Sequence, residues 1–210
     1  MKQTQKKYAI AVDALKCIDC KACMIACKVE NRVPEGFWRN WIKNSDTAAG
    51  LQTQFQPGQC MQCDSPSCVS ACPVGATFKG PDGLVVIDAT KCIGCGNCVT
   101  ACPYGARYRN PTTATADKCD FCQHRLQKGE EPACVETCPT RTRVFGDLND
   151  PGSDINARLK STKHLRIINP LINTEPNIFY TDQTVLLNWP REPTLPGNIH
   201  MSPRFWKSSG

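Results

Sequence analysis

Sixteen cysteines are the residues of this 210-residue chain whose type and spacing point most directly to chemistry. They form four groups of four, and none is left over. The groups are Cys17, Cys20, Cys23, Cys27; Cys60, Cys63, Cys68, Cys72; Cys92, Cys95, Cys98, Cys102; and Cys119, Cys122, Cys134, Cys138. Residues 92–103 follow the pattern C-x2-C-x2-C-x3-C-P, which is the ligand spacing of bacterial [4Fe–4S] loops. Four groups of thiolates therefore predict four such clusters.

Disulfides and zinc are the two alternative uses of so many cysteines. Disulfides are common in small Cys-rich secreted chains, but Cys17, Cys20 and Cys23 are too close in the chain for each to reach a separate partner in good geometry. Zinc sites usually gather two plus two ligands from separate C-x2-C loops. Three cysteines in one loop, with a remote fourth before a proline, favour the iron–sulfur interpretation.

The composition supports a fold that depends on bound metal. Hydrophobic residues make up 40% of the chain, and that figure includes the cysteines. We therefore expect the apoprotein to be poorly folded. The formal charge of +6 changes when the clusters are counted, because sixteen thiolates contribute −16 and four oxidised 2+ cores contribute +8, which leaves about −2. This value removes the argument for a nucleic-acid partner.

Membrane insertion and export signals are not expected from the sequence. No stretch approaches 18 consecutive apolar residues. Residues 1–7 are polar and basic, but neither an apolar run nor a twin-arginine pair accompanies them.

An internal repeat organises the elements that must position the cysteines. Residues 8–13 and 84–88 read as short strands that lead into the first and third groups, at an offset of 75 residues. The second and fourth groups correspond more loosely. The chain is therefore predicted to be a duplicated two-motif unit.

A short helical turn is expected after the third cysteine of each group, for example at residues 24–26, 69–71 and 99–101. Pro73, Pro103 and Pro139 end three of these turns. Lys28 follows the first group instead, so that helix is expected to continue to Glu30. Such a turn carries the fourth cysteine away from the other three, toward a neighbouring cluster.

The pairing of the groups stays open at this level, and we favour a nested arrangement over sequential pairing. In the nested arrangement the first group pairs with the fourth and the second with the third. The four ligand sets are then Cys17, Cys20, Cys23 with Cys138; Cys119, Cys122, Cys134 with Cys27; Cys60, Cys63, Cys68 with Cys102; and Cys92, Cys95, Cys98 with Cys72.

Two long segments lie outside the cysteine loops. Residues 34–41 form an aromatic and basic cluster, expected in a loop that covers a cluster or contacts a partner. Beyond residue 140 there is no cysteine, Ser153–Ser161 is a predicted helix with Ser153 as its N-cap, and the proline-rich tail is expected to lie extended along a partner.

No catalytic constellation is evident. The chain has no complete G-x-G-x-x-G and no P-loop, and its three histidines are isolated in the sequence. All sixteen predicted ligands are cysteines, so no iron is left open for a substrate. The sequence predicts a non-catalytic electron-transfer protein.

A resemblance to a known family rests on the fourth and second groups. The fourth reads C-D-F-C-Q-H-R-L at residues 119–126, then Gly129, P-A-C at 132–134 and C-P at 138–139; the second reads C-M-Q-C-D-S-P-S-C at residues 60–68. Over about residues 8–150 the chain resembles the four-cluster ferredoxin (beta) subunits of dimethyl sulfoxide reductase-family molybdopterin oxidoreductases. In that family the first group pairs with the fourth and the second with the third.

The resemblance implies a fold and a domain organisation. It implies an α+β fold built as a duplicated bacterial two-[4Fe–4S] ferredoxin, with short strands, helical turns and much loop. Residues 1–150 would hold two interleaved units, the outer one from residues 8–30 and 117–146 and the inner one from 58–108. Residues 151–210 would form a cysteine-free extension that docks on a partner.

The resemblance also implies partners and a location. The partners would be a large catalytic subunit that holds molybdenum bound by two pterin guanine dinucleotides, and a quinone-reactive membrane subunit or a cytochrome. Residues 34–41 resemble the subgroup that acts on polysulfide, thiosulfate, tetrathionate or arsenic oxyanions. Such subunits are often exported already folded with a signal-bearing partner, which implies a periplasmic location; a cytoplasmic one is the alternative. A free soluble polyferredoxin and, from another class, a zinc-binding structural protein are the competing functions.

Overall fold

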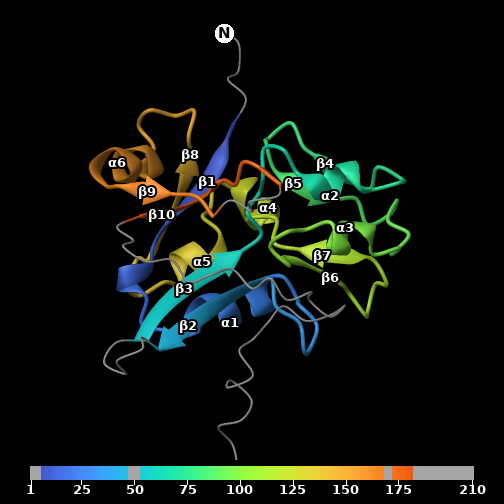
Figure 1. Cartoon of the computed structure of the whole chain (residues 1–210), viewed down its shortest axis with the longest axis horizontal. Helices are drawn as coiled ribbons and strands as arrows, with labels where there is room; N and C mark the ends of the chain where they lie inside the picture. The colour runs from blue at the N-terminus through green and yellow to red at the C-terminus, as the bar shows by residue number, and fades with distance from the viewer. Residues whose placement is uncertain (1–5, 47–52, 168–171, 182–210) are drawn as a thin grey trace, which may run out of the picture.

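A computed structural model describes residues 6–46, 53–167 and 172–181 of the chain (Figure 1). The strands are β1 (Tyr8–Asp13), β2 (Asn40–Asp46), β3 (Thr53–Gln59), β4 (Thr77–Lys79), β5 (Val85–Ile87), β6 (Arg107–Arg109), β7 (Ala116–Lys118), β8 (Arg143–Asp147), β9 (His164–Leu165) and β10 (Ile178–Thr181). The helices are η1 (Ala14–Lys16), α1 (Ala22–Glu30), α2 (Ser67–Ser70), α3 (Asn97–Thr100), α4 (Gln123–Leu126), α5 (Ala133–Glu136) and α6 (Asp154–Ser161). None of these helices has the length and apolar character needed to cross a membrane.

A four-stranded sheet in the order β8-β1-β10-β9 forms one side of the molecule (Figure 1). Strand β1 lies between β8, to which it is antiparallel, and β10, to which it is parallel. Ile10 and Val12 of β1 belong to the main apolar core, whereas Ala9 and Ala11 point to the opposite face and contact Ile155 of α6. The strand is therefore buried on both faces, and its small alanines lie on the side that a helix covers.

Close packing of α6 on this sheet requires a glycine in β8. A Cβ atom at Gly146 would lie only 2.9 Å from a side-chain carbon of Ile155 and closer still to the Ser153 hydroxyl. Ser153 is the N-cap residue, as predicted, but its side chain makes no capping hydrogen bond. Helix α6 is thus held by packing on β8 and β1.

Two short hairpins, β4–β5 and β6–β7, occupy the other side of the molecule together with α2 and α3 (Figure 1). Helix α2 packs against α3 there, and α1 packs against α5 nearer the sheet. The helices of the first and fourth groups therefore meet each other, as do those of the second and third. Hairpin β2–β3 lies beside α1.

The residue before the second cysteine has a positive φ in all four cysteine loops. These residues are Asp19 (56°), Gln62 (47°), Gly94 (68°) and Phe121 (57°). Only one of them is glycine, although a left-handed backbone is costly for other residue types. At Gly94 the requirement is also steric, because a Cβ atom would lie 2.1 Å from the Ala114 carbonyl oxygen. The four loops thus share one backbone turn without sharing its sequence.

Several expectations about local structure are confirmed. The strand at residues 8–13 matches β1, the strand near residues 84–88 is β5, and α1 continues to Glu30. Short helices lie at the third cysteine of each group, although they begin before that cysteine rather than after it. The segment 34–41 differs in part, because its last two residues, Asn40 and Trp41, begin β2.

The described part of the C-terminal region differs from the expected separate extension. Strand β10 pairs with β1, with Ile178 opposite Ile10. Just before it, the Asn177 amide N–H donates to the Met61 carbonyl oxygen at 2.8 Å, and the Ser65 N–H donates to the carbonyl of Thr174 at 3.1 Å. Residues 172–181 therefore pack on this chain's own second cysteine loop. The rest of the predicted docking tail, residues 182–210, lies outside the described residues.

The role of β10 can be tested by truncating one buried side chain. Ile178 is 1% exposed in the core, so Ile178→Ala should destabilise the holoprotein by about 2–5 kcal/mol and lower the midpoint of thermal cluster loss by roughly 4–20 °C. The measurement is the visible absorbance of the holoprotein during heating. Ile172→Ala, at a residue 45% exposed, is the control and should change stability by no more than about 0.5 kcal/mol. Equal midpoints for both variants would contradict this role.

Candidate metal centres

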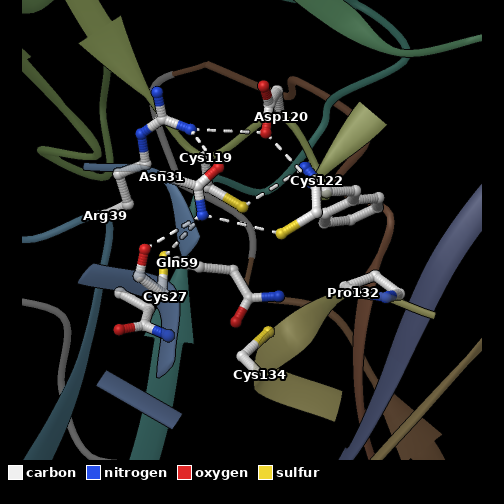
Figure 2. A pocket seen from close by; sticks show the side chains of 11 residues that line it. Cys27, Asn31, Arg39, Gln59, Cys119, Asp120, Cys122, Pro132 and Cys134 are labelled. Carbon is white, nitrogen blue, oxygen red and sulfur yellow. Dashed lines mark hydrogen bonds and ion pairs between the residues drawn. The ribbon is translucent and has the colours of Figure 1, made fainter. Parts of the chain in front are cut away.

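Four cysteines from the first and fourth groups surround one cavity, which we name site B (Figure 2). Its thiols are Cys27, Cys119, Cys122 and Cys134, and all four are buried. The empty volume, including the part open to solvent, is about 270 Å³. One water molecule takes about 30 Å³, so this space accommodates a polyatomic group. Cys27 reaches the cavity from α1, and the other three belong to the fourth group.

A polar network borders site B. The Asn31 side-chain amide points at the thiols of Cys27 and Cys122, with its nitrogen 3.6 Å from each sulfur (Figure 2). Arg39 donates to the Asn31 side-chain oxygen at 2.9 Å and forms an ion pair with Asp117 at 2.7 Å. Because the arginine fixes the amide oxygen, the amide N–H group is oriented toward the sulfurs. Hydrogen bonds of this kind stabilise negative charge on metal ligands.

A second cavity, site A, brings together the first three cysteines and the last one. Cys17, Cys20, Cys23 and Cys138 line it, and its empty volume, including the part open to solvent, is about 300 Å³. The Thr142 N–H donates to the Cys138 sulfur at 3.4 Å. Burial raises the pKa of Cys138, but hydrogen bonds from Thr140 and Thr142 outweigh it, so that pKa lies below its usual value.

Site C is the set from the second group and the end of the third. Burial, together with the charges of the neighbouring Cys60, Cys102 and Cys68, raises the pKa of the Cys63 thiol to about 12. Thr174, from the segment before β10, hydrogen-bonds with the Cys63 sulfur at 3.3 Å. The four thiols of this set are therefore mutual neighbours, and the C-terminal segment contacts one of them.

We name as site D the loop of the third group and the end of the second group, whose helices pack against each other. Cys92, Cys95 and Cys98 share this loop, and Cys72 follows α2, which packs against α3. Backbone N–H groups point at two of these sulfurs, from Ala116 to Cys92 at 3.4 Å and from Thr77 to Cys72 at 3.5 Å. The Thr77 hydrogen bond lowers the pKa of Cys72. The proximity of Cys72 to the loop rests on the helix packing.

The four sites follow one another in the order A, B, C, D. Cys134 of site B lies close enough to Cys23 of site A for their charges to interact. Cys119 of site B likewise lies close enough to Cys60 of site C for their charges to interact. Between sites C and D, the Arg107 guanidinium interacts with thiols of both sets. These interactions connect site A with site B, site B with site C, and site C with site D.

Two buried side chains join sites B and C. Gln62 donates to the Cys119 carbonyl oxygen at 2.9 Å and accepts from the Val85 N–H at 2.7 Å. The Lys118 ammonium group donates hydrogen bonds to the backbone of the same two residues. It donates to the Cys119 carbonyl oxygen at 2.8 Å and also to the Val85 carbonyl oxygen. These contacts connect the second and fourth cysteine loops through β5.

The two end sites reach the surface. Cys20 of site A and Cys95 of site D are exposed. Beside them lie the exposed apolar side chains of Ile18 (60%) and Ile93 (65%). Exposed apolar residues beside a functional site are typical of contact surfaces for partners. In the described part of the chain, the series of sites thus begins and ends near solvent.

The donor sets fit [4Fe–4S] clusters. The sets of sites A and B each provide four sulfur atoms around an open space, and backbone or amide N–H groups are directed at those sulfurs. Within the described residues, no three His, Cys, Asp or Glu side chains converge closely enough for a single metal ion. Burial raises the pKa of Cys134 to about 11, so cluster binding, which requires thiolates, releases protons.

Several residues at these sites were not predicted from the sequence. Asn31 follows Cys27 by one helical turn, and this i, i+4 spacing was a usable signal. Thr174 is 111 residues from Cys63 and carried no signal. Of the segment 34–41, Arg39 and Asn40 line site B, and the Phe37 ring stacks on Tyr108 with the ring centroids 4.9 Å apart.

Comparison with known proteins connects this arrangement to a family. Two models described as 4Fe-4S dicluster domains match residues 16–76 and 51–148. The chain is 41% identical to the B subunit of tetrathionate reductase from Salmonella typhimurium, over 83% of this chain and 72% of that protein. It is 42% identical to the B subunit of polysulfide reductase from Wolinella succinogenes, over 83% of this chain and 93% of the relative.

The chain thus belongs to the family of iron–sulfur electron-transfer subunits of molybdopterin oxidoreductases. A third relative, the thiosulfate reductase electron transfer subunit PhsB of Salmonella typhi, is 44% identical over 71% of this chain and 81% of its own length. Membership confirms the resemblance drawn from residues 60–68 and 119–139. With sixteen cysteines and two dicluster domains, a member of this family carries four [4Fe–4S] clusters.

Asn31 offers a test of the polar network at site B. Asn31→Leu removes the N–H donor that faces two ligand sulfurs, so negative charge on this cluster is less stabilised and its reduction potential should fall. The measurement is a redox titration followed by paramagnetic resonance, in which one of the four clusters should shift. Gln127→Leu, at an exposed position beyond α4, is the control and should leave all four potentials unchanged. An unshifted spectrum for Asn31→Leu would show that the amide has no electrostatic effect.

Proposed function

We propose that this chain is a non-catalytic subunit that passes single electrons between a molybdopterin catalytic subunit and a quinone-linked membrane subunit or another redox carrier. The observation that carries the proposal is the linear series of four cysteine sites with an exposed cysteine at each end. A series with two accessible ends suits transfer between two partners. The sulfur-compound reductases among the relatives support a complex that acts on inorganic sulfur compounds.

We propose the nested ligand sets as the binding sites. Site A holds its cluster through Cys17, Cys20, Cys23 and Cys138, and site B through Cys119, Cys122, Cys134 and Cys27. Site C uses Cys60, Cys63, Cys68 and Cys102, and site D uses Cys92, Cys95, Cys98 and Cys72. The shared cavities of sites A and B support the outer two sets, and the mutual influence of the site C thiols supports the third.

The same contacts support a finer description of the fold as a duplicated α+β ferredoxin. In this description residues 8–30 and 117–146 form the outer unit, and residues 58–108 form the inner one. The pairing of β1 with β8 and of α1 with α5 supports the outer unit, and the packing of α2 on α3 supports the inner one. Residues 182–210 are then the segment that docks on a partner.

Each bound [4Fe–4S] cluster supplies one-electron chemistry. The chain's own residues do the rest. Buried thiols at site B exclude water from the middle of the series. Backbone N–H groups that donate to the sulfurs of Cys72, Cys92 and Cys138 stabilise the negative charge that arrives with an electron. Gln62 and Lys118 hold the loops of sites B and C at a fixed separation.

We propose site A as the end that faces the catalytic subunit and site D as the end that faces the second carrier. The exposed Ile18 and Ile93 give each end an apolar contact for its partner. We propose a periplasmic location, in which this chain is exported already folded together with a catalytic subunit that carries the export signal. A cytoplasmic complex is the alternative.

Purification of the native assembly tests the function. A tagged chain in its own host should co-purify one-to-one with a large molybdenum-containing subunit, and the complex should reduce tetrathionate, polysulfide or thiosulfate with an artificial electron donor. Mass spectrometry and molybdenum analysis give the composition. A holoprotein that purifies only as a monomer would instead indicate a free polyferredoxin.

The ligand sets can be tested by exchanging one fourth cysteine. Cys138→Ser should perturb the cluster held by Cys17, Cys20 and Cys23, because serine is a poorer ligand at site A, and should leave sites C and D intact. Low-temperature paramagnetic resonance of the holoprotein measures this. Cys27→Ser is the matched variant and should perturb the cluster of Cys119, Cys122 and Cys134 instead. The reverse pattern would contradict the nested sets.

A further inference from the structure

Two buried arginines occupy equivalent places in the two halves of the series. Arg107 begins β6 and Arg143 begins β8, and each is 3% exposed. Each follows the fourth cysteine of its group by five residues, Cys102 in one case and Cys138 in the other. Burying a charge costs free energy unless the charge is paired. The groups that contact these two guanidinium groups therefore indicate what the arginines do.

Arg107 lies between sites C and D. Its Nη2 atom donates to the Cys68 sulfur of site C at 3.0 Å, and Nη1 donates to the Thr77 hydroxyl at 3.2 Å. The thiols whose charge acts on it belong to both sites: Cys68, Cys60 and Cys102 of site C, and Cys98 of site D. No carboxylate is among these partners, so the positive charge acts directly on the cysteine sulfurs.

Arg143 has the same relation to sites A and B. Its Nη2 atom lies 3.9 Å from the Cys23 sulfur of site A, and Nη1 donates to the side-chain oxygen of Gln59. The Cys134 sulfur of site B and the Cys17 sulfur of site A also interact electrostatically with Arg143. An arginine side chain stays protonated in proteins, so the buried guanidinium of Arg143 places a positive charge beside the Cys23 sulfur.

The two other groups carry no such arginine. Five residues after Cys27 stands Arg32, which is exposed, and five residues after Cys72 stands Thr77, the acceptor for Arg107. Lys118 is another buried cation near Cys68, but its ammonium group donates to backbone carbonyl oxygens. Each pair of sites therefore has one arginine whose guanidinium is directed at a ligand sulfur.

We propose that Arg107 and Arg143 are positioning residues that raise the reduction potentials of the two cluster pairs, Arg107 for sites C and D and Arg143 for sites A and B. One-electron reduction takes a cluster from the 2+ to the 1+ core, with the electron supplied by the redox partner, and adds one negative charge beside the guanidinium. The arginine is protonated before and after, so no proton moves. A fixed positive charge in a buried site favours the reduced form.

The proposal rests on the nested sets of the proposed function and is tested in the assembled complex. Arg107→Gln keeps a hydrogen-bond donor but removes the charge, so the potentials of the site C and site D clusters should become more negative, with the larger shift at site C. Arg143→Gln should shift sites A and B instead. Redox titration followed by paramagnetic resonance measures all four potentials. Unchanged potentials in both variants would overturn the proposal.

Two control variants separate charge from other effects. Arg32→Gln removes an exposed arginine at the equivalent sequence position and should shift nothing. Arg107→Lys keeps the charge and should shift the potentials less than Arg107→Gln; equal shifts in the two would overturn the charge effect. If Arg107→Gln shifted the potential of one cluster from sites C and D and one from sites A and B, the charge effect would stand and the nested ligand sets would be wrong.

A milder substitution tests the same role if the Arg107→Gln protein loses iron. Thr77→Val removes the hydroxyl that holds Nη1 of Arg107 but leaves the guanidinium and the Thr77 backbone N–H in place. The site C potential should become more negative by a smaller amount, with iron content unchanged. A Thr77→Val complex with full iron and wild-type potentials at sites C and D would overturn the positioning role.

Discussion

One turn of helix between the third and fourth cysteine of every group is the constraint on which the structure depends. Cys27 lies within α1, whereas Cys72, Cys102 and Cys138 lie two residues beyond the ends of α2, α3 and α5. Four residues of helix advance by about 6 Å, so the turn carries the fourth cysteine away from the third. The third stays with its own loop, and the fourth reaches a neighbouring site. Helix α1 packs on α5 and α2 packs on α3, and we propose that each packed pair gives two adjacent sites that exchange one ligand each.

Burial of the thiols is the second constraint, because it requires donors to compensate for charge. Burial raises the pKa of Cys63 and Cys134 above the ordinary thiol value, and a bound cluster keeps such groups as thiolates. The donors that accommodate this charge come from distant parts of the described chain: an amide at Asn31, a backbone N–H at Thr142, and a guanidinium at Arg107. The polypeptide between the cysteine loops therefore forms the environment of the clusters as well as connecting them.

The sequence predicted what repeats and missed what occurs once. The cysteine groups and β1 followed from spacing and from the repeat at Val12 and Ile87. The extent of α1 followed from Lys28, which stands where other groups have proline, and the family followed from the motifs at residues 60–68 and 119–139. Hairpin β2–β3 carried no repeat and no tight-turn signal. The parallel pairing of β10 with β1 joins residues 168 positions apart, Ile10 with Ile178, and such contacts have no local signature. The left-handed backbone at Gln62 and Phe121 was hidden because only Gly94 carried the residue type that indicates it.

We propose that the four cysteine groups are nested and that the four sites form one linear series. A structure of the holoprotein in its complex, with iron positions located by anomalous scattering, tests it most directly. We expect four clusters in the order A, B, C, D, with Cys138 bound to the cluster of Cys17 and Cys27 bound to the cluster of Cys119. A cluster held by Cys17, Cys20, Cys23 and Cys27 together would contradict it.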